Sequence, residues 1–139
     1  MTIKSIKLIK NKIIKNKKGD IIKFINKNNK YFSGFGEVYF SEIKKNKIKG
    51  WNIHYKYKCI LTVPFGNVEF SFFNPELKIK KIKKIIINKK NNYTIIIPNG
   101  IWFSFKSKTK LSIVANVLNN IHKSEEMNKS NIINGIRIK

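Results

Sequence analysis

The feature that most constrains this chain is a two-residue alternation of apolar and polar side chains. In residues 67–73, Val68, Phe70 and Phe72 share one face and the residues between them are polar. A half-buried β-strand requires this period. Residues 59–63 repeat the pattern, and the Pro-Phe-Gly that follows them is typical of a turn. The two segments together therefore predict a β-hairpin.

Several other short segments are rich in β-branched or aromatic residues and are separated by clusters of Gly, Pro, Asn and Lys. They lie at residues 36–43, 77–88, 93–98, 101–105 and 111–118. Strands at this spacing predict an all-β sandwich or barrel. The helical pattern is thin, since only residues 119–130 favour a turn or a short helix.

Two lysine-rich segments, residues 11–18 and 78–90, carry isoleucines at near-alternate positions. Lysine on an exposed strand discourages edge-to-edge pairing with other molecules. We therefore predict that both segments form edge strands with charged outer faces.

The chain has 139 residues and a formal net charge of +23. Its length fits a single domain, covering residues 1–139. The charge alone suggests a nucleic-acid partner, but Arg137 is the only arginine among the 30 basic residues. A nucleic-acid-binding protein is expected to use arginine, whereas lysine, isoleucine and asparagine are the residues that A/T-rich codons supply. A lysine-rich nucleic-acid-binding barrel is thus the least favoured of our hypotheses.

The remaining composition predicts a cytoplasmic protein with no membrane partner. Cys59 is the single cysteine, so we expect a buried free thiol and no intrachain disulfide. No apolar run approaches the roughly 20 residues that span a bilayer. The first fifteen residues lack the small-residue cleavage site of a signal peptide.

Two stretches resemble the paired motifs of cupin barrels. The first cupin motif contains His-x-His and closes on a glycine, and residues 50–66 resemble it with Asn52 and His54 at the histidine pair. The second motif contains Pro-x-Gly-x-x-His, and residues 98–103 resemble it with Phe103 at the histidine position. The resemblance implies a single-domain, jelly-roll cupin fold.

The same resemblance argues against a metal site. A metal-binding cupin takes its ligands from the histidine pair, a following glutamate and the later histidine. Here the glutamate position falls on Lys58 or Cys59, and only His54 remains of the four ligands. One imidazole cannot hold a divalent metal, whose sites normally have three or four protein ligands. We predict no metal and no other cofactor.

Among cupins, the closer resemblance is to the dTDP-4-dehydrorhamnose 3,5-epimerases and the dTDP-sugar 3,4-ketoisomerases, the RmlC-like and WxcM-like cupins. It rests on the order and spacing of residues 36–74, 93–105 and 112–126. It implies a nucleotide-sugar isomerase or epimerase of surface polysaccharide biosynthesis that removes a proton beside a ketone. It also implies a homodimer in which the N-terminal strand, residues 1–15, is exchanged between barrels.

The catalytic residues of the 3,5-epimerases are not matched. Their basic histidine aligns with Asn52, and an amide cannot take a proton. Their acidic tyrosine aligns near Ala115, where this chain has no tyrosine. The second histidine of the ketoisomerase pair aligns with His54, which implies acid–base catalysis by an imidazole that titrates near neutral pH. The alternative is that His54 is an ordinary strand residue.

The substrate-binding residues that the resemblance implies are also partly changed. Lys18 and Lys49 align with two arginines that hold the diphosphate, and lysine keeps the charge without the bidentate fork. Asn52 would share the strand face of His54 and hydrogen-bond the sugar. The aromatic candidates for stacking on the ligand are Trp51, Tyr57 and Trp102. A cupin that binds a nucleotide-sugar or carbohydrate without turnover is the alternative to an enzyme.

Overall fold

The computed structural model describes residues 5–121, 127–133 and 136–137, and these residues form strands and connecting loops. The strands are β1 (Lys7–Lys10), β2 (Lys12–Ile14), β3 (Ile21–Lys23), β4 (Glu37–Lys44), β5 (Ile48–His54), β6 (Cys59–Phe65), β7 (Val68–Phe73), β8 (Ile82–Ile87), β9 (Tyr93–Ile97), β10 (Trp102–Ser107), β11 (Leu111–Leu118), β12 (Met127–Lys129), β13 (Ile132–Ile133) and β14 (Ile136–Arg137).

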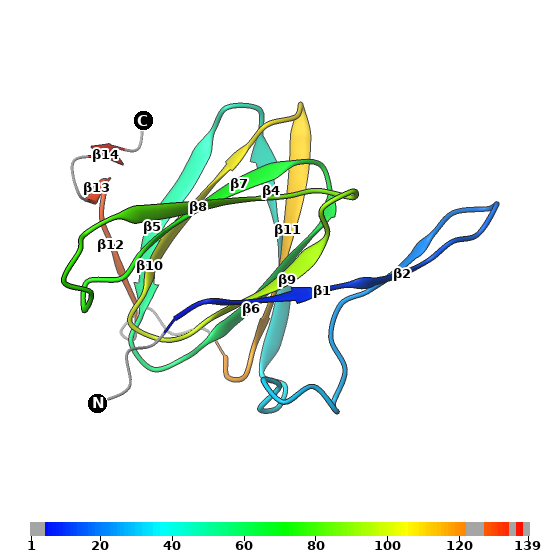
Figure 1. The fold of residues 1–139 in the computed structure, drawn as a ribbon, viewed down its shortest axis with the longest axis horizontal. Helices are drawn as coiled ribbons and strands as arrows, with labels where there is room; N and C mark the ends of the chain where they lie inside the picture. Colours follow the sequence, from blue (N-terminus) through cyan, green and yellow to red (C-terminus); the bar gives the residue numbers. More distant parts are fainter. Residues whose placement is uncertain (1–4, 122–126, 134–135, 138–139) are drawn as a thin grey trace.

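Two five-stranded sheets face each other and enclose the core (Figure 1). The first has the order β1-β9-β6-β11-β4, and the second has the order β12-β5-β10-β7-β8. All the pairings within both sheets are antiparallel. The predicted all-β fold is therefore confirmed. No helix in the described part of the chain is long and apolar enough to cross a membrane.

The predicted hairpin of residues 59–63 and 67–73 is wrong. β6 pairs with β9 and β11, whereas β7 pairs with β10 and β8, so the chain passes from one sheet to the other between them. Gly66 makes this passage with a φ of +96°, and a Cβ atom there would lie 2.3 Å from the Ser112 Oγ. A Pro-Phe-Gly turn reverses the chain in either arrangement, so the local pattern does not distinguish a hairpin from a crossing between sheets.

The prediction of lysine-rich edge strands is confirmed for β8, which lies at one edge of the second sheet. The other lysine-rich segment contains β2, which pairs with β3 in a hairpin that projects from the barrel (Figure 1). Residues 127–129, within the segment where a turn or short helix was predicted, instead form strand β12. Residues 122–126 of that segment lie outside the described residues.

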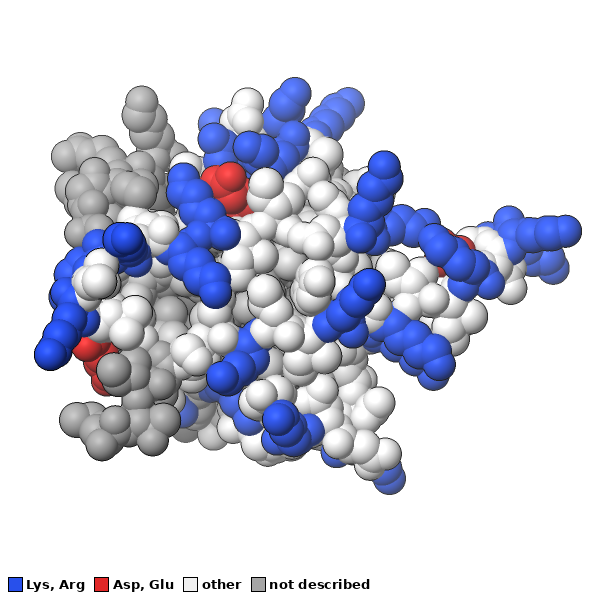
Figure 2. Space-filling model, in the orientation of Figure 1, with Lys and Arg blue, Asp and Glu red and all other residues white. Residues whose placement is uncertain are grey.

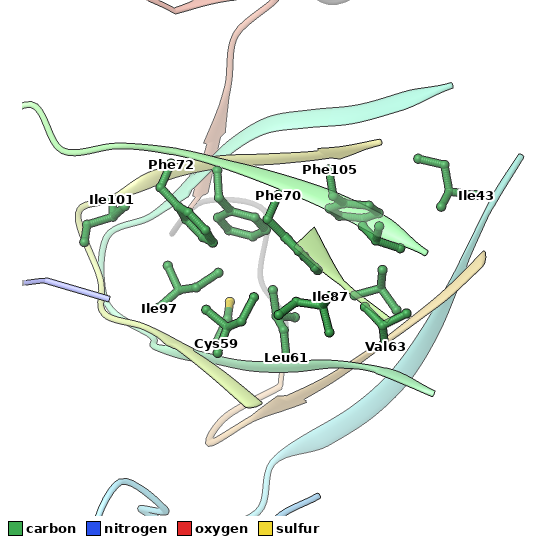
Figure 3. Close-up of a cluster of buried hydrophobic side chains, with 14 of the residues drawn as sticks. Ile43, Cys59, Leu61, Val63, Phe70, Phe72, Ile87, Ile97, Ile101 and Phe105 are labelled. Carbon is green, nitrogen blue, oxygen red and sulfur yellow. The ribbon is translucent and has the colours of Figure 1, made fainter. Parts of the chain in front are cut away.

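The main core lies between the two sheets (Figure 3). It contains the predicted inward face of β7, with Val68, Phe70 and Phe72, and the predicted buried thiol of Cys59. A second, smaller cluster lies on the outer face of the first sheet, where aromatic residues of segment 24–32 cover Ile60. Both faces of β6 are therefore buried.

The projecting hairpin is connected to the barrel through Asp20. Its carboxylate contacts the Lys15 Nζ at 3.1 Å and, from the turn after β8, the Lys89 Nζ at 3.2 Å. Hydrogen bonds from the Asn16 backbone N–H and from these two lysines lower the pKa of Asp20 from 3.8 to about 2. The folded-state pKa of Asp20 lies below the ordinary value. The contacts of its carboxylate therefore stabilise the folded state above pH 4, and this stabilisation is lost as the pH falls toward 2.

We predict that Asp20→Asn raises the amide hydrogen-exchange rates of β2 and β3 at pH 6. The difference from the unsubstituted protein should shrink as the pH falls through 2, since the folded-state carboxylate of Asp20 is half protonated at its pKa and mostly protonated below it. Glu76→Gln, which removes a carboxylate from an exposed turn, serves as the control and should leave the exchange rates of the hairpin unchanged. Equal exchange rates for Asp20→Asn and the unsubstituted protein at pH 6 would contradict the prediction.

Candidate functional site

A cavity of about 370 Å³ lies between the two sheets, toward the edges formed by β4 and β12. Leu61, Phe103, Phe105 and Val114 belong both to the main core and to the lining of the cavity, so they form the boundary between the two. The other lining residues are mostly polar. The barrel interior thus contains an apolar core and, next to it, a pocket lined mostly by polar residues.

The wall from the second sheet carries Lys49, Asn52 and His54 of β5. Asn52 and His54 share a face because the side-chain period of a strand is two residues. Lys49 shares the same face because of a bulge: Phe103 pairs with Asn52 and the next residue of β10 pairs with Gly50. The extra residue in β5 reverses the alternation. The close approach at this bulge requires glycine, since a Cβ on Gly50 would lie 2.7 Å from the Phe103 carbonyl oxygen.

His54 is held firmly at the end of β5. Only 5% of the residue is exposed. Its ring stacks on Phe103 with a centroid separation of 6.2 Å and an interplanar angle of 19°. Its backbone carbonyl accepts a hydrogen bond of 2.7 Å from the Gly100 N–H. The imidazole is therefore a fixed titratable group in a cavity wall.

The wall from the first sheet carries Glu37, Tyr39 and Ser41 of β4 and Asn116 of β11. Tyr39 and Asn116 are direct cross-strand partners. The Asn116 Nδ2 donates a hydrogen bond of 2.9 Å to the Tyr39 hydroxyl. Hydroxyl and amide groups of this wall thus face the imidazole wall across the cavity.

In the described part of the chain, the charged residues that line the cavity are two lysines and one glutamate. The Lys49 Nζ donates a hydrogen bond of 2.8 Å to the Ser41 Oγ, which links the two walls. Lys129 enters from β12, whose pairing with β5 places it opposite Asn52. Glu37 is the single lining carboxylate among the described residues, so the cavity they form is suited to an anionic ligand that also carries hydroxyl groups.

Four of the predicted site residues do not line this cavity. Trp51 is 1% exposed and lines a smaller cavity on the other side of the second sheet, because it is adjacent to Asn52 in the strand. Trp102 is adjacent to Phe103 and points away from the cavity for the same reason. Tyr57 lies in the loop after β5, and Lys18 lies at the tip of the projecting hairpin.

Five polar lining residues were not predicted from the sequence: Glu37, Tyr39, Ser41, Asn116 and Lys129. Asn116 could have been found, because it interrupts the otherwise apolar inward face of β11 between Val114 and Leu118. The others have no distinctive local pattern. They reach the cavity only through the pairing of β4 with β11 and of β12 with β5.

No group of three or more His, Cys, Asp or Glu residues capable of holding a metal ion occurs among residues 5–121, 127–133 and 136–137. Around His54, the described polar residues of the lining are lysines, amides and hydroxyls with one glutamate. This donor set does not match the three or four N, O or S ligands of a protein metal site.

Two facing antiparallel sheets with a polar pocket between them define a jelly-roll barrel of the cupin type. More specifically, the chain has the fold of the RmlC-like cupins. It superimposes on a dTDP-sugar isomerase from Desulfovibrio desulfuricans G20 with a TM-score of 0.86 and 22% identity, covering 92% of this chain and 85% of that one. The fold that the sequence resemblance implied is confirmed.

Two further solved structures share the fold. The sugar 3,4-ketoisomerase QdtA from Thermoanaerobacterium thermosaccharolyticum, in complex with TDP, gives a TM-score of 0.76 and 20% identity over 90% of this chain and 88% of that one. The dTDP-4-dehydrorhamnose 3,5-epimerase from Elizabethkingia anophelis gives 0.78 and 11% over 100% and 82%. No protein-family model matches the chain, and no curated protein sequence is significantly similar to it.

Proposed function

We propose that this protein is an isomerase or epimerase acting on a nucleotide-linked 4-keto-sugar. The observation that carries the proposal is the position of His54, a buried imidazole in the wall of a polar cavity between the sheets. Proteins with the same fold include dTDP-sugar isomerases and 3,5-epimerases. One of them, the ketoisomerase QdtA, was solved with TDP and, as a histidine-to-asparagine mutant, with TDP-4-keto-6-deoxyglucose.

The cavity suits the reacting sugar and its phosphates. Its volume of about 370 Å³ lies within the range of roughly 300–1,000 Å³ that is usual for ligand sites. Lys49 and Lys129 supply two positive charges for a diphosphate, and Asn52 supplies an amide for the sugar hydroxyls. Phe103 and Phe105 supply an apolar surface for the sugar ring.

The proposed reaction begins with proton removal from the carbon beside the ketone. A neutral imidazole accepts such a proton, and the imidazolium that forms can return it. The hydrogen bond to the His54 carbonyl holds the end of β5, and the Phe103 ring packs against the imidazole. Together these contacts keep the imidazole in one place in the cavity. A change of position of the ketone, or inversion at the carbon, follows from where the proton returns.

The test is solvent exchange in deuterium oxide with TDP-4-keto-6-deoxyglucose as the probe. We expect deuterium at the carbon beside the ketone, detected by loss of its proton resonance. We also expect TDP to raise the melting temperature, because a ligand that binds only the folded state stabilises it. Stabilisation by single-stranded DNA or RNA instead of TDP, with no deuterium exchange, would overturn the proposal.

A second candidate function is binding of the nucleotide-sugar without turnover. Asn52 favours this alternative, because the amide stands where the resemblance implies a first histidine, and an amide cannot take a proton. Stabilisation by TDP without any deuterium exchange would select this candidate.

Lys49 and Lys129 are the proposed phosphate-binding residues of the cavity. Lys49→Ala and Lys129→Ala should each weaken TDP binding by about 10-fold or more, since a charge-assisted hydrogen bond contributes about 1.5–3 kcal/mol. Thymidine binding should change little. Lys18→Ala is the matched control and should leave TDP binding unchanged, because this lysine lies on the projecting hairpin. Equal affinities for TDP in all three variants would contradict the assignment.

The wider setting is also part of the proposal. We propose that the protein acts on this substrate in the cytoplasm, in the synthesis of surface polysaccharide. We propose a homodimer; β1 pairs with β9 of its own chain, and the hairpin of β2 and β3 projects outward as a means of contacting a second barrel. The lysines on the face shown in Figure 2 are dispersed among uncharged residues, which favours a compositional origin of the charge over a nucleic-acid site.

A further inference from the structure

Asn116 is a polar residue at a buried, inward-facing position of β11, where an apolar residue is expected. It is 2% exposed, and its inward-facing neighbours on β11, Val114 and Leu118, are both buried. A buried amide is unfavourable unless its polar atoms are hydrogen-bonded. Its Nδ2 donates to the Tyr39 hydroxyl at 2.9 Å, whereas its Oδ1 is buried without a hydrogen-bond partner among the described residues. An apolar side chain would therefore serve the fold better.

The geometry assigns Asn116 a role in the chemistry of the cavity. It contacts a phenol that lines the cavity from the first sheet, and the imidazole of His54 lines the same cavity from the second sheet. Enolisation uses a base at the carbon and an acid at the ketone oxygen, and groups on two walls of one cavity are suited to act on these two atoms. The Tyr39 phenol is thus a counterpart to His54, on a strand where the sequence resemblance did not place an acid.

We propose that Asn116 is a positioning residue that makes the Tyr39 phenol the proton donor of this site. The inference rests on the proposed function. His54 takes the proton from the carbon beside the ketone, and the electron pair moves to the ketone oxygen. The phenol O–H bond breaks as its proton passes to that oxygen, which leaves a neutral enediol and a tyrosinate. The Asn116 N–H stabilises the tyrosinate until the carbonyl re-forms and the proton returns.

The kinetic test compares Asn116→Leu and Tyr39→Phe with the unsubstituted protein. We expect Asn116→Leu to lower kcat for deuterium exchange by about 10- to 100-fold, with KM and the Kd for TDP changed less than threefold. The variant that carries both substitutions should exchange deuterium no more slowly than Tyr39→Phe alone, because the amide of Asn116 acts through the phenol of Tyr39. A kcat unchanged in Asn116→Leu, losses that multiply in the double variant, or a parallel loss of TDP affinity would overturn the proposal.

A spectroscopic test does not depend on turnover. The phenolate absorbance of Tyr39 is obtained in two backgrounds, with Asn116 and with Asn116→Leu. In each, the absorbance of the Tyr39→Phe variant is subtracted from that of the protein with Tyr39. We expect this absorbance to appear at lower pH with Asn116 present than in Asn116→Leu. The other titratable groups lining the cavity, Glu37 on β4, Lys49 and His54 on β5 and Lys129 on β12, are the same in both backgrounds.

The two tests separate the inference from the function on which it rests. Identical phenolate titrations in the two backgrounds overturn the role of Asn116, whatever the activity. A titration that differs as expected, in a protein that exchanges no deuterium into any keto-sugar, supports the amide–phenol interaction and overturns the proposed function instead.

Discussion

Replacing His54 with glutamine should lower the rate of deuterium exchange into TDP-4-keto-6-deoxyglucose by about 10²- to 10⁴-fold, the usual contribution of a general acid or base. Glutamine keeps a polar side chain of similar length and cannot accept a proton at neutral pH. The affinity for TDP should stay within about threefold, since the proposed phosphate contacts come from Lys49 and Lys129. The measurement is the exchange rate by proton NMR, with TDP affinity by calorimetry.

Asn52→Ala is the matched control for the histidine substitution. It changes a neighbouring residue of the same cavity wall without removing a titratable group. We expect it to raise KM for the keto-sugar and to leave most of kcat in place, because Asn52 is assigned to binding. Exchange in His54→Gln within about threefold of the unsubstituted protein would show that another group is the base.

The largest effect on stability should come from Phe70→Ala, with a loss of about 3–5 kcal/mol in the free energy of unfolding. Phe70 is fully buried in the main core (Figure 3), with its ring centroid 5.7 Å from that of Phe105 and 6.2 Å from that of Phe72. Its removal leaves a cavity between the sheets that the neighbouring rings cannot fill. The loss is a large share of the roughly 5–15 kcal/mol by which a domain is stable.

Urea denaturation measures this loss from the shift in midpoint at constant slope. Phe65→Ala is the matched control, since Phe65 is 57% exposed at the end of β6, and it should cost less than about 1 kcal/mol. A loss below about 1 kcal/mol in Phe70→Ala would mean that the sheets do not close over this ring as described.

Much of the fold follows from local patterns. The alternation in residues 67–73 identified a strand and its buried face, and the lysines of residues 78–90 identified an edge. These predictions succeeded because a two-residue period and exposed charge depend on a few neighbouring residues. The hairpin prediction failed because the turn at Gly66 is compatible with two pairings, and the choice depends on strands far away in the sequence.

The candidate site, like the fold, could be predicted from the sequence only in part. The pairing of Asn52 and His54 on one face could be predicted, because both lie in one strand at a spacing of two. Lys49 reaches the same face only through the bulge, and Trp51 and Trp102 leave it because they lie beside inward-facing residues. Aromatic character alone does not tell which face of a sheet a residue occupies.

The sequence by itself determined that this chain forms short strands around an apolar core, and that His54 and Asn52 share one strand face. Only the tertiary structure decided what lies opposite them. Tyr39 and Asn116 come from β4 and β11, and the cavity between the walls depends on how the two sheets face each other. The physical reason is that side-chain alternation is a property of one strand, whereas a site between two sheets depends on long-range pairing, to which nearby residues contribute little.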